Sequence, residues 1–254
     1  IRLWILMALF GFILHSCDRF LLLQTQPVSP SEKLHAVLIL PRFLTFFSLL
    51  YFFGIFLAVG IGAFQIENEI RRKFLLNFLS RNVNRTMYLS SRVLAACFLF
   101  LTFSLTSLAL FHLMYSEYHL ARDWRLYRIY LYLFLLQFMI YALSQFLSGI
   151  FSPILSAGLT LFLLFLPGLL RFLWSTTEEK WLATVWRVLY WLLPAFDRVN
   201  LVEMGFYLAQ EKQMKFLFRR APGDVSLSLH LFLYALLLLW FYSRRFQKRA
   251  LSGG

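Results

Sequence analysis

The sequence predicts an all-α integral membrane protein, and three observations support this prediction. The chain of 254 residues is 60% hydrophobic and contains 30 Phe, well above the roughly half-apolar composition of soluble domains. Its apolar residues form runs of about 20, the length that an α-helix needs to cross ~30 Å of hydrocarbon. These runs lack the alternation of apolar and polar residues that is typical of transmembrane β-strands. Helices are therefore the expected membrane spans.

The apolar runs predict six spans in a single transmembrane domain that covers residues 1–254. We expect them at about 1–17, 38–64, 93–115, 129–151, 154–174 and 225–243. The fourth and fifth spans are joined by a tight link in "SGIFSPIL", where Pro153 suits the first turn of a new helix. The long connectors are residues 18–37, 66–92, 116–128 and 175–224.

Positive charge predicts the orientation of these spans, because Lys and Arg near span ends tend to stay in the cytoplasm. The 27-residue connector 66–92 holds six Lys/Arg, and the C-terminal stretch "RRFQKRALSGG" holds four more in 11 residues. Connector 175–224 holds seven in 50 residues, a lower density. We therefore expect connector 66–92 and both termini in the cytoplasm, and 175–224 outside.

The outer connector 175–224 contains the pattern of a short helix. Trp181, Val185, Leu189 and Leu192 recur at helical spacing, and Pro194 closes the run. Tryptophan prefers the headgroup level, and a helix too short to span can lie flat there. We expect an interfacial helix between the fifth and sixth spans; a helix that simply packs on the ends of the spans is the alternative.

Connector 66–92 contains an amphipathic stretch from Glu69 to Ser80. One side carries Ile70, Phe74, Leu75, Phe78 and Leu79, and the other carries Arg72, Lys73, Asn77 and Ser80. Arg71 and Leu76 break the pattern, which favours a helix lying on a surface over a buried one. By composition alone, the same stretch also fits a plain cytoplasmic connector.

The connector also resembles a segment of the permease subunits of ATP-binding-cassette (ABC) transporters of type 2. In that family a glutamate, a Gly-Thr and a "(S/A)-x-Pro-V-(S/N)-R" run follow the second span. Glu69 matches the glutamate, and "SRNVNRTMYLSSR" supplies Ser80, Arg81, Val83, Asn84 and Arg85, with Arg85 16 positions after Glu69. The departures are Lys73-Phe74 in place of Gly-Thr, Asn82 in place of proline, and Ser90-Ser91 in place of a common Gly-Lys.

Other stretches extend the resemblance over most of the chain. "ALSQFLSGIFSPILSAGLTLFLLF" is similar to the family's fourth and fifth spans with their tight link. "WLLPAFDRVNL" is similar to the outer segment before the last span, and "WFYSRRFQKRAL" to its basic end.

The resemblance implies a transport function rather than catalysis by this chain. Connector 66–92 would be the cytoplasmic coupling helix through which a separate ABC-type ATPase moves the spans, with Glu69 and Arg85 at its ends. Arg72, Lys73 and Arg81 would be polar contacts with the ATPase. The permease would work as a homodimer or heterodimer in a bacterial inner membrane. ATP and Mg²⁺ would bind in the ATPase, and this chain would bind no cofactor.

Several other motifs are weaker. The terminal "LSGG" matches part of an ABC signature, but no phosphate loop "GxxxxGK(S/T)" accompanies it. The five His show no metal-ligand spacing. The net charge of +13 does not indicate a nucleic-acid partner, because the basic residues flank long apolar runs. "LHSCD" resembles a lipoprotein cleavage box at Cys17, but a first span is the preferred interpretation.

Two arginines fall inside or at the outer edge of predicted spans. Arg42 and Arg171 lie near the outer ends of spans two and five, where a long side chain can reach the headgroups. An outer vestibule that attracts anions is the functional alternative. The competing hypothesis for the whole chain is a membrane-embedded enzyme or scaffold that uses the Trp-rich outer segment.

Overall fold

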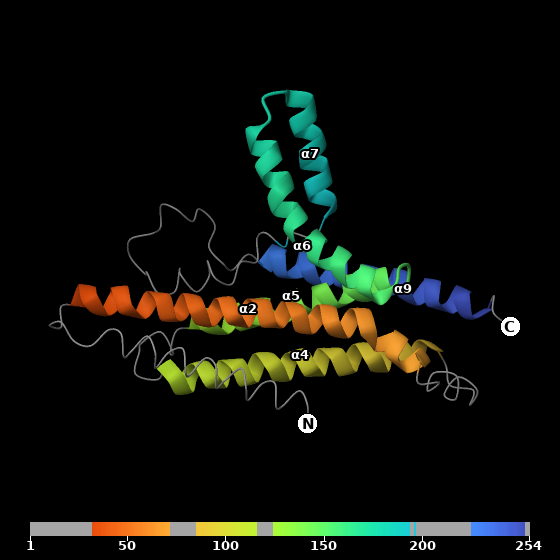
Figure 1. Cartoon of the computed structure of the whole chain (residues 1–254), viewed down its shortest axis with the longest axis horizontal. Coiled ribbons are helices and arrows are strands. Elements are labelled where there is room, and N and C mark those ends of the chain that lie inside the picture. The colour runs from red at the N-terminus through yellow and green to blue at the C-terminus, as the bar shows by residue number, and fades with distance from the viewer. Residues whose placement is uncertain (1–31, 72–84, 116–123, 194–195, 197–224, 252–254) are drawn as a thin grey trace. The chain divides into compact units, whose positions relative to one another are not determined.

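The computed structural model describes residues 32–71, 85–115, 124–193, 196 and 225–251. This part of the chain forms six α-helices and contains no strand. The helices are α2 (Glu32–Arg71), α4 (Arg85–Tyr115), α5 (Trp124–Ser148), α6 (Pro153–Thr176), α7 (Lys180–Leu192) and α9 (Val225–Leu251) (Figure 1). For these residues the all-α prediction is confirmed.

Four of the helices are long and apolar enough to cross a membrane. The stretches are Thr45–Gln65, Met87–Leu113, Leu126–Ser148 and Pro153–Thr176, and they correspond to the second to fifth expected spans. The expected first span, 1–17, lies outside the described residues. Helix α9 covers the expected sixth span, 225–243, but it is not one of the four. The helices thus fit a multi-pass membrane protein, and the number of six spans stays a prediction.

The helices on either side of connector 66–92 are longer than the apolar runs predict. Helix α2 continues beyond residue 64 to Arg71, and α4 begins at Arg85 rather than near residue 93. An α-helix satisfies its own backbone hydrogen bonds, so the end of an apolar run does not have to end the helix. Glu and Arg, which follow Gln65, are also good helix formers.

The link between α5 and α6 is as tight as the sequence predicts. The N–H of Phe151 donates to the carbonyl oxygen of Leu147 at 2.8 Å, which extends the last turn of α5. Ser152 then takes an extended conformation as the N-cap of α6, and Pro153 is the first residue of the new helix. Proline is favoured there because the first N–H groups of a helix have no partner within it.

The described chain divides into two compact units. Unit 1 comprises Ile1–Phe52, Ser104–Leu131 and Leu201–Pro222. Its described core contains a cluster of buried phenylalanine rings: Phe46 and Phe47 of α2 and Phe111 of α4, with centroids 5.4 to 5.7 Å apart. The Tyr130 hydroxyl of α5 donates to the Ser107 carbonyl oxygen of α4 at 3.2 Å. Aromatic packing and a buried interhelical hydrogen bond thus both contribute to the described part of unit 1.

Unit 2 comprises Phe53–Phe103, Tyr132–Asn200 and Gly223–Gly254. Its central element is α5, in which every residue from Tyr132 to Gln145 is buried except the half-buried Phe134. Tyr141 packs on Phe100 of α4 with ring centroids 5.8 Å apart, and Phe138 packs on Phe232 of α9 at 6.3 Å. Helices α2 and α6 contact α5 through polar groups, described below.

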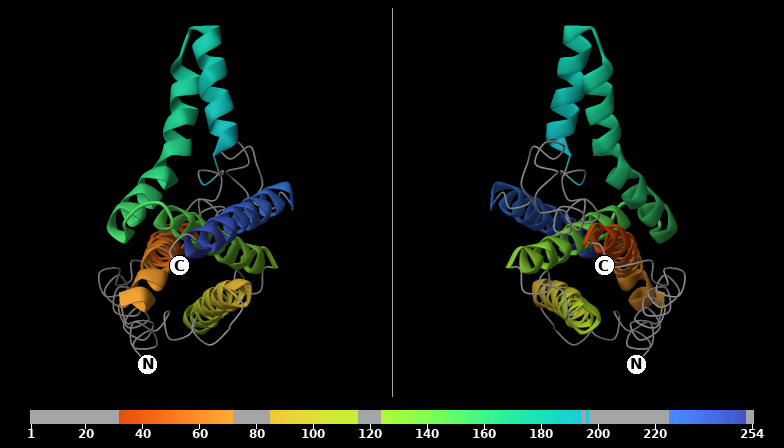
Figure 2. Two further views of the ribbon diagram at one scale, coloured as in Figure 1. Left: turned by 90° about the vertical axis from the view of Figure 1, so that its right-hand side faces the viewer. Right: turned by 90° about the vertical axis from the view of Figure 1, so that its left-hand side faces the viewer.

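Helices α6 and α7 form an antiparallel hairpin in unit 2 (Figures 1 and 2). Helix α6 continues through Pro167 but changes direction along its length (Figure 1), because the proline ring clashes with the carbonyl of the preceding turn. The Trp174 and Tyr190 rings lie 6.3 Å apart, and the Arg187 guanidinium lies 4.4 Å from the centre of the Trp174 ring. These contacts attach α7 to the C-terminal half of α6.

Candidate functional site

The residues expected to couple the chain to an ATPase lie at the ends of two helices or between them. Glu69 belongs to the last turn of α2, and Arg85 is the first residue of α4. Arg72, Lys73 and Arg81 lie outside the described residues, as does most of the amphipathic stretch from Glu69 to Ser80. The coupling helix therefore stays a prediction.

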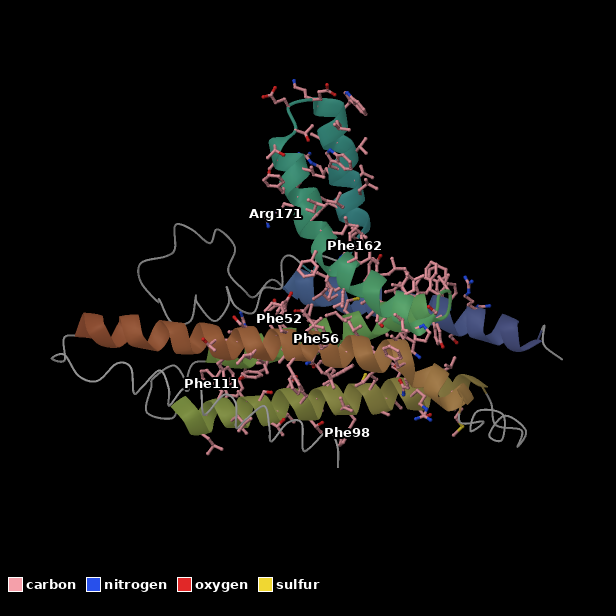
Figure 3. All side chains as sticks on the ribbon, in the orientation of Figure 1. Phe52, Phe56, Phe98, Phe111, Phe162 and Arg171 are labelled. Carbon is pink, nitrogen blue, oxygen red and sulfur yellow. The ribbon has the colours of Figure 1, made fainter. Side chains whose placement is uncertain are left out.

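The two arginines of the expected outer vestibule belong to different units. Arg42 is part of α2 in unit 1, and Arg171 is an exposed residue of α6 in unit 2 (Figure 3). A vestibule formed by both residues stays a prediction as well.

A group of uncharged polar side chains lies in unit 2, all of them buried except the half-buried Gln65. We name it the polar seam: Gln137, Tyr141, Ser144 and Gln145 of α5, with Gln65 of α2 and Ser156 of α6. The hydroxyl of Ser156 donates to the carbonyl oxygen of Ser144 at 2.8 Å, and the hydroxyl of Ser144 donates to the carbonyl oxygen of Val59 at 3.2 Å. Tyr141 donates to Oε1 of Gln65 at 3.3 Å. The polar seam thus connects α5 to both α2 and α6.

The polar seam faces a row of small residues on α2. Gly54, Ala58 and Gly62 recur every four residues, so they lie on one face of the helix, and all three are buried. A Cβ atom at Gly62 would lie 2.8 Å from Cβ of Ser144, and one at Gly54 would lie 2.6 Å from Nε2 of Gln137. The absence of side chains at these two positions is what allows α2 to approach α5 so closely.

The other side of α2 carries large apolar side chains. Phe52 and Phe56 are 52% and 62% exposed, and both project from α2 (Figure 3). In a bilayer this distribution would place the phenylalanines against lipid and the small residues against protein, since lipid tails satisfy apolar side chains as well as a protein core does.

Gln137 and Gln145 differ from the other members of the polar seam. Their side chains are 0% and 1% exposed, and among the described residues neither amide has a hydrogen-bond partner for its Nε2 or its Oε1. A polar group buried without a partner costs about 1–3 kcal/mol. Such groups are uncommon in native proteins.

The polar seam has the chemistry of a hydrogen-bonding surface. Its members are amides, hydroxyls and one phenol, and none carries a charge at neutral pH. Across the residues that the structure describes, no group of three His, Cys, Asp or Glu could hold a metal ion. The described free thiol, Cys97 of α4, is half-buried. These groups can bond to neutral polar partners and can link helices.

Sequence reasoning did not identify the polar seam, although the signal is present. Gln137, Tyr141, Ser144 and Ser148 follow one another at intervals of four, three and four residues inside an apolar run, which is the spacing of one helix face. The four-residue repeat of small residues on α2 is the matching signal on the other side.

The short helix expected in connector 175–224 is present as α7. It runs from Lys180 to Leu192 and therefore includes the predicted series from Trp181 to Leu192. Tyr190 is buried, whereas Trp181 is 67% exposed and Val188 is 54% exposed. The helix is confirmed, and its location at a membrane interface stays a prediction.

Comparison with known proteins yields no relative: no protein-family model, no curated protein and no solved structure matches this chain. The functional interpretation therefore depends on the sequence pattern and on the geometry described above.

Proposed function

We propose that this chain is the membrane-spanning permease subunit of an ABC transporter of type 2. A separate ABC-type ATPase subunit would bind and hydrolyse Mg²⁺-ATP, and the permease would use the resulting motion to export a substrate. The permease would work as a homodimer or heterodimer in a bacterial inner membrane, with both termini in the cytoplasm.

The observation that carries this proposal is the resemblance of the segment from Glu69 to Arg85 to the family's coupling segment. Helix α2 ends shortly after the first of these residues, and α4 begins at the second. A partner that gripped the intervening segment would therefore pull on two long helices at once. Soluble proteins often bind a short amphipathic helix in a groove on their surface, and the coupling segment would be bound in the same way.

Helix α2 offers a path from the coupling segment to the polar seam. It is unbroken from Gly54 to Glu69, so a displacement at its end moves the face of small residues against α5. Glycine and alanine have no large side chains to interlock, and uncharged hydrogen bonds can exchange partners at low cost. The contact between α2 and α5 is thus suited to a shift between two packed arrangements.

Affinity purification of the tagged chain from its native membrane tests the proposal. A protein with a Walker motif should co-purify and hydrolyse ATP in the complex. Glu69→Ala and Arg85→Ala should each uncouple hydrolysis from transport while the complex stays assembled. Glu67→Ala is the matched control, because Glu67 has the same charge and occupies a position of the same helix two residues before Glu69, on a different face.

Two outcomes would contradict the proposal. One is a chain that purifies alone in an active form, which would favour the membrane enzyme or scaffold. The other is a Glu69→Ala variant that behaves like the Glu67→Ala control, since the coupling segment would then have no special glutamate.

A further inference from the structure

Helix α9 has a packed face that fixes its rotation about its own axis. Leu231, Ala235, Leu238 and Tyr242 follow one another at helical spacing and are at most 6% exposed. Tyr242 forms a buried cluster with Tyr88 and Leu89 of α4. The opposite side of α9 is exposed, and we name it the outward face.

The outward face changes in character along the helix. It starts with exposed leucines at 233, 236 and 237, continues with the exposed rings of Trp240 and Phe241, and ends with exposed Arg244 and Arg245. An order of aliphatic, then aromatic, then basic side chains matches the order of hydrocarbon, interface and headgroup phosphates in a bilayer leaflet.

Charge on α9 has a single sign. The sequence from Val225 to Leu251 contains no Asp or Glu and adds Lys248 and Arg249 after the two exposed arginines. An anionic partner is therefore favoured at this end of the helix, and a membrane surface is the partner whose apolar part would also cover the leucines.

Arg244 is held in a position that suits a phosphate. Its guanidinium lies 5.2 Å from the centre of the Trp240 ring, and that ring packs against Phe241 at 4.9 Å. The cation–π contact is made with the face of the Trp240 ring. The N–H groups on the edge of the guanidinium stay available for two parallel hydrogen bonds to phosphate oxygens.

We propose that Trp240, Arg244 and Arg245 form a binding site for the headgroup of an anionic phospholipid. The two arginines hold the phosphate, Trp240 marks the interface, and the outward leucines contact the acyl chains. The site does not depend on the transport function proposed above, because it uses the outward face of α9 alone.

Lipid titration of the full purified chain, followed by native mass spectrometry, tests this site. Phosphatidylglycerol should bind more tightly than phosphatidylcholine with the same acyl chains. Arg244→Gln should weaken phosphatidylglycerol binding about fivefold, and Arg244→Gln with Arg245→Gln should weaken it about 25-fold, since each basic residue near an anionic surface contributes about fivefold. Phosphatidylcholine binding should not change.

Three controls make the result specific. Lys180→Gln removes an exposed charge from α7 and should leave phosphatidylglycerol binding unchanged. Replacing both arginines by lysine keeps the charge but removes the paired N–H groups, so it should retain part of the binding, between wild type and the double glutamine variant, which shows that the outward face is still folded. Glycerol phosphate, which lacks acyl chains, should not compete at concentrations that saturate the lipid site.

The proposal is overturned if the two lipids bind wild type equally, or if the double glutamine variant binds phosphatidylglycerol like wild type. Equal losses in Lys180→Gln and Arg244→Gln would also overturn it, because attraction would then come from overall charge. Competition by glycerol phosphate would replace the lipid with a soluble phosphate ligand.

Discussion

The close approach of α2 to α5 at Gly62 predicts a large difference between two alanine substitutions that are only two residues apart. Gly62→Ala places a methyl group 2.8 Å from Cβ of Ser144 and 2.8 Å from the carbonyl oxygen of Tyr141. Gly60→Ala places the same methyl group where no atom lies within 4 Å. Both glycines belong to α2, so the second variant is a matched control for the first.

The magnitude follows from the contact distances. Carbon atoms pack best at about 3.5–4.0 Å, so Gly62→Ala has to separate α2 from α5 locally by at least about 0.7 Å. The bond from Ser144 to the Val59 carbonyl oxygen, now 3.2 Å, would then exceed hydrogen-bonding distance. Overpacking of this kind costs about 1–3 kcal/mol.

Helix propensity acts in the opposite direction but does not affect the comparison. Alanine is better than glycine in a helix by up to about 1 kcal/mol, and both variants gain this term. We therefore expect Gly60→Ala to be neutral or slightly stabilising. Gly62→Ala should have a free energy of unfolding about 1–3 kcal/mol below that of Gly60→Ala.

Thermal unfolding of the purified full chain in detergent, followed by tryptophan fluorescence, measures this difference. A change of 1 kcal/mol shifts Tm by about 2–4 °C in a chain of this size, so the two variants should differ by about 2–12 °C. Equal Tm values for the two variants would refute the close approach of α2 to α5 at Gly62.

Three further predictions concern other features. Gln137→Leu replaces an amide without partners by an apolar side chain of similar size, so it should stabilise the chain by about 1–3 kcal/mol; a lower Tm would show that the amide has a partner. Arg187→Gln removes the cation–π contact with Trp174 at 4.4 Å and should lower the Tm by about 1–4 °C, because such contacts contribute about 0.5–1 kcal/mol at exposed sites; Arg187→Lys should keep part of the effect. Asn84→Cys, in a variant without the two native cysteines, should react with a membrane-impermeant maleimide only after the cells are permeabilised. Labelling of intact cells would place connector 66–92 outside and would contradict the coupling role.

The sequence predicts the described helices well, because the signals for them are local. Apolar runs of sufficient length indicate α2, α4, α5 and α6, and the spacing of apolar residues after Trp181 indicates α7. The signal for the start of α6 is also local, since proline at Pro153 is favoured in the first turn of a helix.

The central position of α5 could not be read from hydropathy. Lipid-facing and protein-facing side chains are both apolar, so an exposed residue such as Phe162 and a buried one such as Leu133 give the same signal. What separates them is the placement of small and polar residues, which allow close helix packing. The repeat from Gly54 to Gly62 and the polar positions of α5 carry that information.

The length of α2 sets the depth at which a partner could reach it. The described apolar stretch Thr45–Gln65 has 21 residues, which is ~31 Å of helix and long enough to cross the hydrocarbon of a bilayer. If the hydrocarbon ended at Gln65, Glu69, four residues further on in the same helix, would lie about 6 Å beyond the acyl chains. A soluble protein that bound this glutamate would have to lie directly on the lipid surface. Its docking face should therefore be flat and should not carry negative charge that repels lipid phosphate groups.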